Sequence, residues 1–492
     1  RLGRRDGHRR ARRALAGALG PGRRKPPAGA AAPAGAVRPP GPVNRLGLVD
    51  DGSTVTDYDD EEIARKHSLA STLAYGEWQK TKINFIDTPG FANFFSDARA
   101  AMRVAEAALL VVDAVHGVEV QTEKVWEEAA SLGLPPLVAL SRLDRDRASM
   151  ERALESLHRD CAREITPIQL PIGEEKGFTG VVDLISMKAH TFTGDGKMTT
   201  GEIPAAMADR AAQARNTLIE MVAEADEALM DAFFANGTLT QEELTSGLKA
   251  ATAAGKIFPL VCLSGLRTIG AQPLLDAIVS LVPSPAERGF ATVDAEGNAT
   301  SVPASESGPY AAFVWKTVAD PFAGRITMLR IVSGTLKADT AVHNQTRDSG
   351  ERLGHLLVMQ GKAQTHVPEH RAGDLGAVAK LKDTRTNDLL AEASTKIRVA
   401  PISFPEPVLS YAIEPKSRGH EDKSSSAMQR LREEEPTISY ARDPQTHELL
   451  LSGQGQLHIE VTVAKLKQRF AVEVNLNPPR IPYRETITAA TE

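Results

Sequence analysis

Short apolar runs and segments of helical periodicity alternate between residues 82 and 144. The apolar runs have the length and composition of strands, and the segments between them repeat apolar residues at helical spacing. The predicted order is strand 83–86, helix 94–107, strand 108–113, helix 121–132 and strand 136–140. Each strand ends in a polar or acidic residue, which is typical of a parallel α/β sheet with its ligand edge at the carboxyl ends of the strands.

The pattern changes twice further along the chain. From Tyr310 it is that of an all-β domain, with apolar strands separated by Gly and Asp turns, and after Phe404 strands and helices alternate again. The predicted divisions are an α/β domain over 43–285 with an insertion at about 156–254, a β domain over 305–400 and a small α+β domain over 403–475.

Residues 1–42 differ from everything that follows. They are dominated by Arg, Ala, Gly and Pro and contain no apolar run of strand length, so we expect them to be disordered. A basic arm for nucleic acid and an organellar transit peptide are the functional alternatives. Transit peptides are usually rich in Ser, and this segment has none.

The composition is typical of a soluble protein from a reducing cellular compartment. Hydrophobic residues make up 42% of the 492 residues, and no apolar run approaches the length of a membrane span. The two cysteines, Cys161 and Cys262, do not form a disulfide framework. The net charge of −5 combines a strongly basic start with an acidic remainder, which does not exclude contacts between local basic patches and phosphate.

The turn Asp87-Thr88-Pro89-Gly90 carries the first candidate chemistry. A carboxylate at the end of a buried strand can support Mg2+, and a glycine N–H beside it can meet a terminal phosphate. Asp, Pro and Gly are also default turn residues, so on its own this stretch is equally compatible with an ordinary strand end.

Several further motifs resemble the GTP-binding domain of translational GTPases. They are Val111-Val-Asp-Ala-Val-His-Gly117, Gln121-Thr-Glu123 and Leu143-Asp-Arg145, in addition to Asp87–Gly90. The nearest likeness is elongation factor G, in its divergent elongation factor G-like branch. The likeness extends from about Val43 to the end through Asp320–Gly324, Ser452–Glu460 and Asn477–Glu485.

This resemblance implies a fold and a function. The fold is an α/β P-loop-type GTP-binding domain with an α+β insertion, then a β-barrel domain and a small α+β, ferredoxin-like domain. The implied cofactors are GTP/GDP and Mg2+. The implied partner is the ribosome, through rRNA and ribosomal proteins, for a cytoplasmic monomer that acts in protein synthesis without a membrane.

The resemblance also assigns roles to individual residues. Ser68 and Asp87 would hold Mg2+, Gly90 would sense the γ-phosphate with Thr88 and Pro89 beside it, and the segment 50–72 would be a loop that orders on ligand binding. The base would be read by Asp144, by Ser141 and Arg142 in the same loop, and by the loop of Ser264 and Gly265.

Two departures from the family pattern put the chemistry in doubt. No G-x-x-x-x-G-K-[ST] phosphate loop occurs in the chain, and residues 1–42 occupy its place. We hypothesise that this segment comes from an altered reading frame; genomic sequence without a Gly-Lys-Thr/Ser loop in either other frame would contradict this. Phe91 stands where the family has a histidine that orients water, and phenylalanine can neither donate nor accept a proton.

Residues 476–492 resemble the entry to the family's fourth domain, and we expect the rest of that domain and the fifth to be absent. Translocation by this polypeptide is therefore not expected. Three alternatives remain open: a nucleotide-free protein that binds the ribosome, a non-functional fragment, and a GTPase similar to ribosome protection or release factors.

Overall fold

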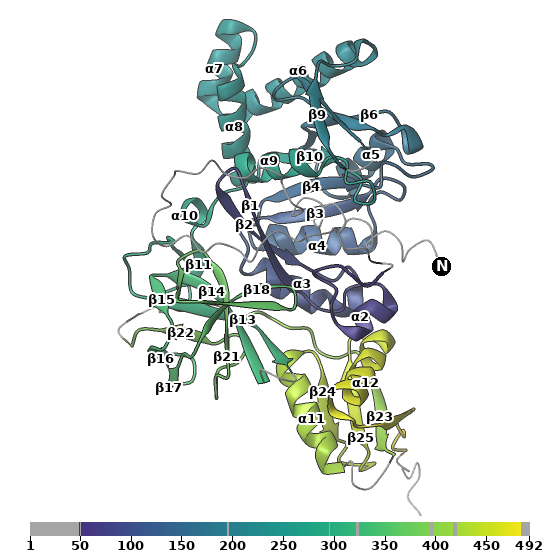
Figure 1. Ribbon diagram of the computed structural model, residues 1–492, viewed down its shortest axis with the longest axis vertical. Helices are drawn as coiled ribbons and strands as arrows, with labels where there is room; N and C mark the ends of the chain where they lie inside the picture. Colours follow the sequence, from purple (N-terminus) through teal and green to yellow (C-terminus); the bar gives the residue numbers. More distant parts are fainter. Residues whose placement is uncertain are drawn as a thin grey trace, which may run out of the picture.

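The computed structural model describes residues 49, 51–193, 196–294, 296–320, 324–393, 395, 397–416 and 421–483. The segment 1–42 lies outside these residues, as does most of the stretch beyond 476 that the sequence assigns to a further domain. Figure 1 shows an α/β domain in the middle, with its insertion at one end, a β domain at its side and a small α+β domain at the other end.

The first domain contains two separate sheets. β3, β4, β10 and β5 form a parallel sheet in that order, as the alternating pattern predicts, whereas β1 and β2 form an antiparallel hairpin. Its elements are α2 (Asp60–Arg65), β1 (Thr72–Trp78), β2 (Thr81–Asp87), η1 (Ala92–Phe94), α3 (Phe95–Met102), β3 (Ala108–Asp113), α4 (Val120–Ser131), β4 (Pro136–Ser141), α5 (Met150–Asp160), β5 (Ile165–Pro167), β10 (Phe258–Cys262), α9 (Ala271–Leu281) and α10 (Pro285–Arg288).

This division corrects the expectation that the strand ending at Asp87 belongs to the parallel sheet. Among the described residues β2 pairs with β1 alone, and β3 pairs with β4 alone. The resemblance places a further strand and the phosphate loop in the first 42 residues, so the strand that would join the hairpin to the sheet is not among those described.

Two helical predictions near this hairpin were also inexact. The helix predicted over 94–107 ends at Met102, because the chain turns there to bury Val104 in the core of the β domain. The segment 50–72, predicted as a loop, contains the short helix α2. Its signal was present in the sequence: Asp59 and Glu62 have the spacing of a capping box.

The insertion adds an antiparallel sheet and a group of helices that share one core with the parallel sheet. Phe178 and Leu218 of the insertion are fully buried with Leu140 of β4. Its elements are β6 (Gln169–Ile172), η2 (Glu175–Gly177), β7 (Gly180–Asp183), β8 (Lys188–Phe192), β9 (Met198–Gly201), η3 (Ala205–Met207), α6 (Ala208–Glu224), α7 (Glu227–Asn236) and α8 (Gln241–Ala253).

The second domain is built around an eight-stranded antiparallel sheet. Trp315 and Phe313 are buried in its interior. The strands are β11 (Phe290–Val293), β12 (Ala299–Val302), β13 (Ala311–Asp320), β14 (Gly324–Ser333), β15 (Thr335–Lys337), β16 (Ala341–Asn344), β17 (Ser349–Arg352), β18 (Leu356–Gln360), β19 (Ala363–Val367), β20 (Glu369–Arg371), β21 (Leu375–Ala379) and β22 (Leu389–Ala391).

The third domain has the strand and helix order of a ferredoxin-like fold. Four antiparallel strands pair in the order β24-β25-β23-β26, and two helices supply the rest of the core. The elements are β23 (Leu409–Pro415), α11 (Glu421–Glu434), β24 (Ser439–Arg442), β25 (Leu449–Gly453), α12 (Gln456–Phe470) and β26 (Val474–Asn477). In the described residues no helix is long and apolar enough to span a membrane.

Candidate nucleotide site

The two predicted base-reading loops begin side by side at the carboxyl edge of the parallel sheet. Strands β3 and β4 pair in register up to Asp113 and Ser141. Strand β10 runs beside β4, and the N–H of Leu263 donates to the carbonyl of Leu140 at 2.9 Å. The loops that begin at Ser141 and Ser264 are therefore neighbours, at the edge where parallel α/β sheets bind ligands.

Arg142 closes the first of these loops onto the end of β3. Its backbone is left-handed, with φ 66°, and its guanidinium donates to Oδ2 of Asp113. His116 Nδ1 lies 3.0 Å from the same oxygen, and the Val115 N–H donates to Oδ1 at 2.9 Å. The head group of Arg142 is thus held by Asp113, and its side chain is 11% exposed.

Asp113 is a site residue that the sequence reasoning did not single out. It ends β3 as Asp87 ends β2, although β2 is only half-buried, so the signal was the acid at the strand terminus. In the structure it organises the neighbouring loop by accepting bonds from a side chain and a backbone N–H.

Ser141 and Asp144 occupy opposite environments in that loop. Ser141 is buried, and its hydroxyl finds no hydrogen-bond partner in the part of the chain that the structure describes. Asp144 is half-buried, and none of the described residues donates to its carboxylate. Asp144 is therefore able to accept two N–H groups from a ligand, whereas Ser141 lies inside the protein.

The Ser264 loop is rigid. The N–H of Ser264 donates to the carbonyl of Ile269 at 3.0 Å, and the N–H of Ile269 returns a bond at 3.1 Å. Ser264 Oγ also accepts from the N–H of Arg267 at 3.2 Å. Gly270, with φ 83°, ends the loop where a Cβ would collide with the carbonyl of Cys262. The amide of Ser264 is consequently engaged within the loop, and Gly265 follows it in a buried position.

The predicted phosphate-binding turn follows the β1–β2 hairpin. Asp87, at the end of β2, lies across from Thr72 of β1. Asp87, Thr88 and Gly90 are half-buried, and Pro89 is buried. The structure therefore places this turn on a hairpin that is not hydrogen-bonded to the parallel sheet within the described residues.

Ser68 is not placed as a metal ligand. Its side chain is buried, and its hydroxyl donates to Oδ1 of Asp57. Among the described residues there is no group of three or more His, Cys, Asp or Glu side chains that could hold a metal ion. Mg2+ is often held by one or two carboxylates together with phosphates and water, and Asp87 has the carboxylate that such a site requires. Asp87 and Ser68 remain the predicted ligands, and in this structure the Ser68 hydroxyl is engaged by Asp57.

Phe91 makes an apolar contact at the junction with the third domain. Its ring lies 4.6 Å from that of His67, centroid to centroid, and it packs against a small cluster of Leu69, Phe94 and Val461. Val461 belongs to α12, so the position that carries a histidine in the family here packs against another domain. His458 of the same helix is buried against Phe94 at 5.6 Å, as a packing residue.

Comparison with known proteins assigns each domain. Residues 40–284 match the family model of the elongation factor Tu GTP binding domain. Residues 309–393 match elongation factor G domain 2, and residues 404–478 match elongation factor G domain III.

A solved structure shows the same arrangement over most of the chain. A crystal structure of a protein from Thermus thermophilus is 32% identical in sequence and superposes with a TM-score of 0.80. The match covers 89% of this chain and 64% of that one, so this chain spans less than two thirds of the length of the protein it resembles.

Proposed function

We propose that this chain, which joins an elongation factor Tu-type GTP-binding domain to elongation factor G domains 2 and III, is an elongation factor G-like GTP-binding protein of translation. The observation that supports this most is the uninterrupted order of the three domains from residue 40 to residue 478. In this proposal the chain belongs to the divergent branch, its partner is the ribosome, and it acts in the cytoplasm as a monomer.

Base recognition in this proposal centres on Asp144. Guanine presents two N–H donors on the edge that a carboxylate can meet, and adenine does not present this pair. The Asp144 carboxylate has no competing donor among the described residues, and Arg142 is held in place by Asp113 so that its stem can cover the base. The loop of Ser264 and Gly265 supplies the neighbouring wall.

Phosphate and metal binding rest on Asp87 and the turn behind it. When Mg2+ is bound with a nucleotide, it neutralises phosphate charge. Asp87 would hold the ion, and the N–H of Gly90 would face the terminal phosphate, with Thr88 and Pro89 shaping the turn between them.

Hydrolysis is a separate matter from binding. Phe91 packs against apolar neighbours and has no group that could orient or deprotonate water. We therefore propose nucleotide binding as the property of this chain, and expect its intrinsic hydrolysis to be slow; ribosome-dependent hydrolysis would need a water-orienting group other than residue 91.

Nucleotide titration of the purified chain tests the proposal. Fluorescent GDP and GTP analogues should bind with Mg2+ present, and unlabelled ATP should not displace them. In Asp144→Asn the acceptor pair becomes an amide that donates to a carbonyl, so guanine affinity should fall at least tenfold and xanthine nucleotides should gain.

Asp146→Asn is the matched control, because Asp146 is an exposed acid in the same loop that contacts only the exposed Lys176, at 3.5 Å, among the described residues. Its nucleotide affinity should equal that of the wild type. No guanine binding up to millimolar nucleotide would overturn the proposal. Co-sedimentation with ribosomes would then separate a nucleotide-free ribosome-binding protein from a non-functional fragment. A protection or release factor-like role would be indicated by binding confined to stalled or terminating ribosomes.

A further inference from the structure

The helix α2 is too short to be stable by itself. Six residues give fewer than two turns, and isolated helices of this length are unstable in water. Its first turn is capped locally: Asp59 Oδ1 accepts from the N–H of Glu61 at 3.0 Å, and Glu62 Oε2 accepts from the N–H of Asp59 at 3.3 Å. Such a cap contributes about 1 kcal/mol, so the helix needs support from other parts of the chain.

Glu62 extends this local order to the residues that follow the helix. It is buried, and its Oε1 accepts from the N–H of Leu69 at 2.9 Å and from that of Ala70 at 3.3 Å. The capping residues thus bind both ends of the segment 59–70, which contains Ser68 and was predicted to be a loop ordered by ligand. A contact that fixes the position of Asp59 therefore fixes the position of residues 59–70 as a whole.

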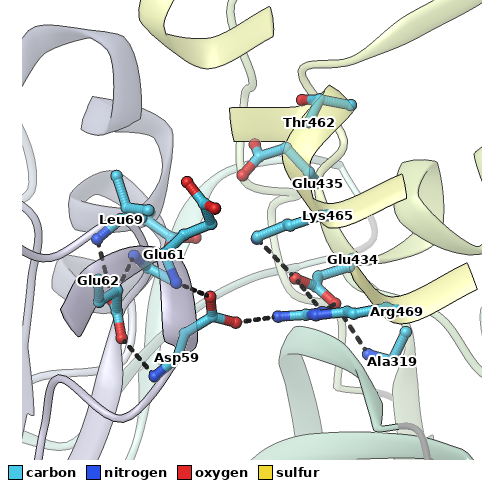
Figure 2. Close-up of polar contacts among 12 residues, drawn as sticks. Asp59, Glu61, Glu62, Leu69, Ala319, Glu434, Glu435, Thr462, Lys465 and Arg469 are labelled. Atoms are coloured by element: carbon cyan, nitrogen blue, oxygen red, sulfur yellow. Dashed lines mark hydrogen bonds and ion pairs between the residues drawn. The ribbon is translucent and has the colours of Figure 1, made fainter. Parts of the chain in front are cut away.

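The third domain holds Asp59. Arg469, in the last turn of α12, donates to Asp59 Oδ2, the carboxylate oxygen that the cap does not use (Figure 2). A second terminal nitrogen of Arg469 donates to Oε2 of Glu434 at 2.9 Å. Arg469 therefore bridges the carboxylate in front of α2 and the carboxylate at the end of α11.

Glu434 ties this bridge to the second domain as well. Its Oε1 accepts from Lys465 Nζ at 3.0 Å, and its Oε2 accepts from the N–H of Ala319 in β13 at 3.1 Å. Figure 2 shows these groups converging from α2, α11, α12 and β13. One buried carboxylate and two cations thus join all three domains.

The bridge lies in a poorly hydrated place. The side chains of Glu434 and Lys465 are 8% and 12% exposed, and those of Asp59 and Arg469 are 18% and 19% exposed. Burial alone would raise the pKa of Glu434, but Lys465 and Arg469 outweigh it and lower this pKa to about 2. The stability of charged side chains in such a place depends on their ion-pair partners, because water cannot solvate a charge whose partner has been removed.

Further contacts reinforce the same junction. Gln468 Nε2 donates to Glu61 Oε1 at 2.7 Å, and Leu69 packs against Val461 in the apolar cluster that includes Phe91. The helix α12 therefore meets the segment 59–70 through charged, polar and apolar side chains together.

We propose that Arg469 makes the third domain the element that orders residues 59–70, so that this segment is fixed by the position of α12 and not by a nucleotide. Displacement of the third domain would release the segment, and docking would restore it. This inference goes beyond the proposed function and does not require nucleotide binding.

Hydrogen exchange of the full chain, measured by mass spectrometry without nucleotide, tests the proposal. In Arg469→Gln, amides of peptides within 59–70 should exchange at least about tenfold faster than in the wild type, because local opening no longer breaks the bridge. Arg469→Lys, which keeps the charge but loses the forked geometry, should lie between the two. Arg480→Gln is the control, since Arg480 lies just beyond the third domain, is 78% exposed and pairs with Glu448 of that domain at 3.3 Å.

Asp59→Asn covers the case in which Arg469→Gln unfolds the third domain. Asparagine still caps α2 but loses its charge, so exchange in 59–70 should rise while peptides of α12 stay protected. Unchanged protection of 59–70 in both variants, with α12 intact, would overturn the proposal. So would wild-type peptides 59–70 that become protected only when GTP is added. Failure of guanine binding would leave this result untouched.

Discussion

The carboxyl edge of the parallel sheet and the junction of the three domains differ in how their charges are used. At the edge, Arg142 is paired with Asp113 and the amide of Ser264 is bonded inside its own loop. The half-buried carboxylate of Asp144 has no donor among the described residues. At the junction, Asp59, Glu434 and Arg469 connect segments from different domains.

The comparison shows that stabilising ion pairs between domains lie at the junction and not at the edge of the sheet. Buried charges at the junction depend on one another, so the domains are held in one relative position. The edge keeps a single carboxylate for a ligand. A change at the junction should therefore affect folding and domain docking, and a change at the edge should affect binding alone.

The largest effect is expected from Glu434→Ala. The substitution leaves Lys465 and Arg469 buried without their carboxylate, which should lower the free energy of unfolding by about 3–5 kcal/mol. Urea denaturation followed by circular dichroism measures this. Glu473→Ala, which removes an exposed carboxylate from the same domain, should leave the midpoint nearly unchanged. Equal midpoints for the two variants would show that the junction stores little stability.

A pH-dependent effect is expected at the next residue, Glu435. Burial, and then the neighbouring Asp97 carboxylate, raise the pKa of Glu435 to about 7, against the opposing influence of Thr437, Lys465 and Lys316. The folded protein therefore keeps a proton that the unfolded chain releases, and this group lowers stability as pH rises from about 4.5 to about 7.

Glu435→Gln should abolish this pH-dependent loss of stability, because it replaces the carboxyl group with an amide that is neutral at every pH. The variant should be more stable than the wild type by roughly 1–3 kcal/mol at pH 8 and equal to it at pH 4. Thermal melts across this range provide the measurement, with the half-exposed Glu460→Gln as control. A difference between variant and wild type that stays the same at both pH values would contradict the assignment.

The smallest of these effects is expected where the two regions meet, at Phe91. Phe91→Ala removes half-buried contacts with Leu69 and Val461 and should cost about 1–2 kcal/mol of stability. Phe91→Leu should retain most of the wild-type stability. Guanine nucleotide affinity, measured in parallel, should not change in either variant; a large change would mean that Phe91 belongs to the edge and not to the junction.

Much of the candidate site follows from local sequence. A run of apolar residues that stops at an acid predicts a strand end, and the order of such ends placed Ser141, Asp144 and Ser264 at one edge. Spacing alone could not place their side chains. Whether Arg142 meets a base or Asp113 depends on how two strands lie in register, and whether Ser68 faces a metal or Asp57 depends on how the chain folds between them.

The sequence by itself determined the succession of an α/β, an all-β and an α+β domain, because hydrophobic periodicity and turn residues are local properties. Only the tertiary structure decided that Arg469 meets Asp59, 410 residues earlier. It also decided that β2 and β3 belong to separate sheets among the described residues. In a sequence, charged residues such as Asp59 and Arg469 are expected on the solvated surface. They pair across a domain junction here because the packing of whole domains removes the water around them.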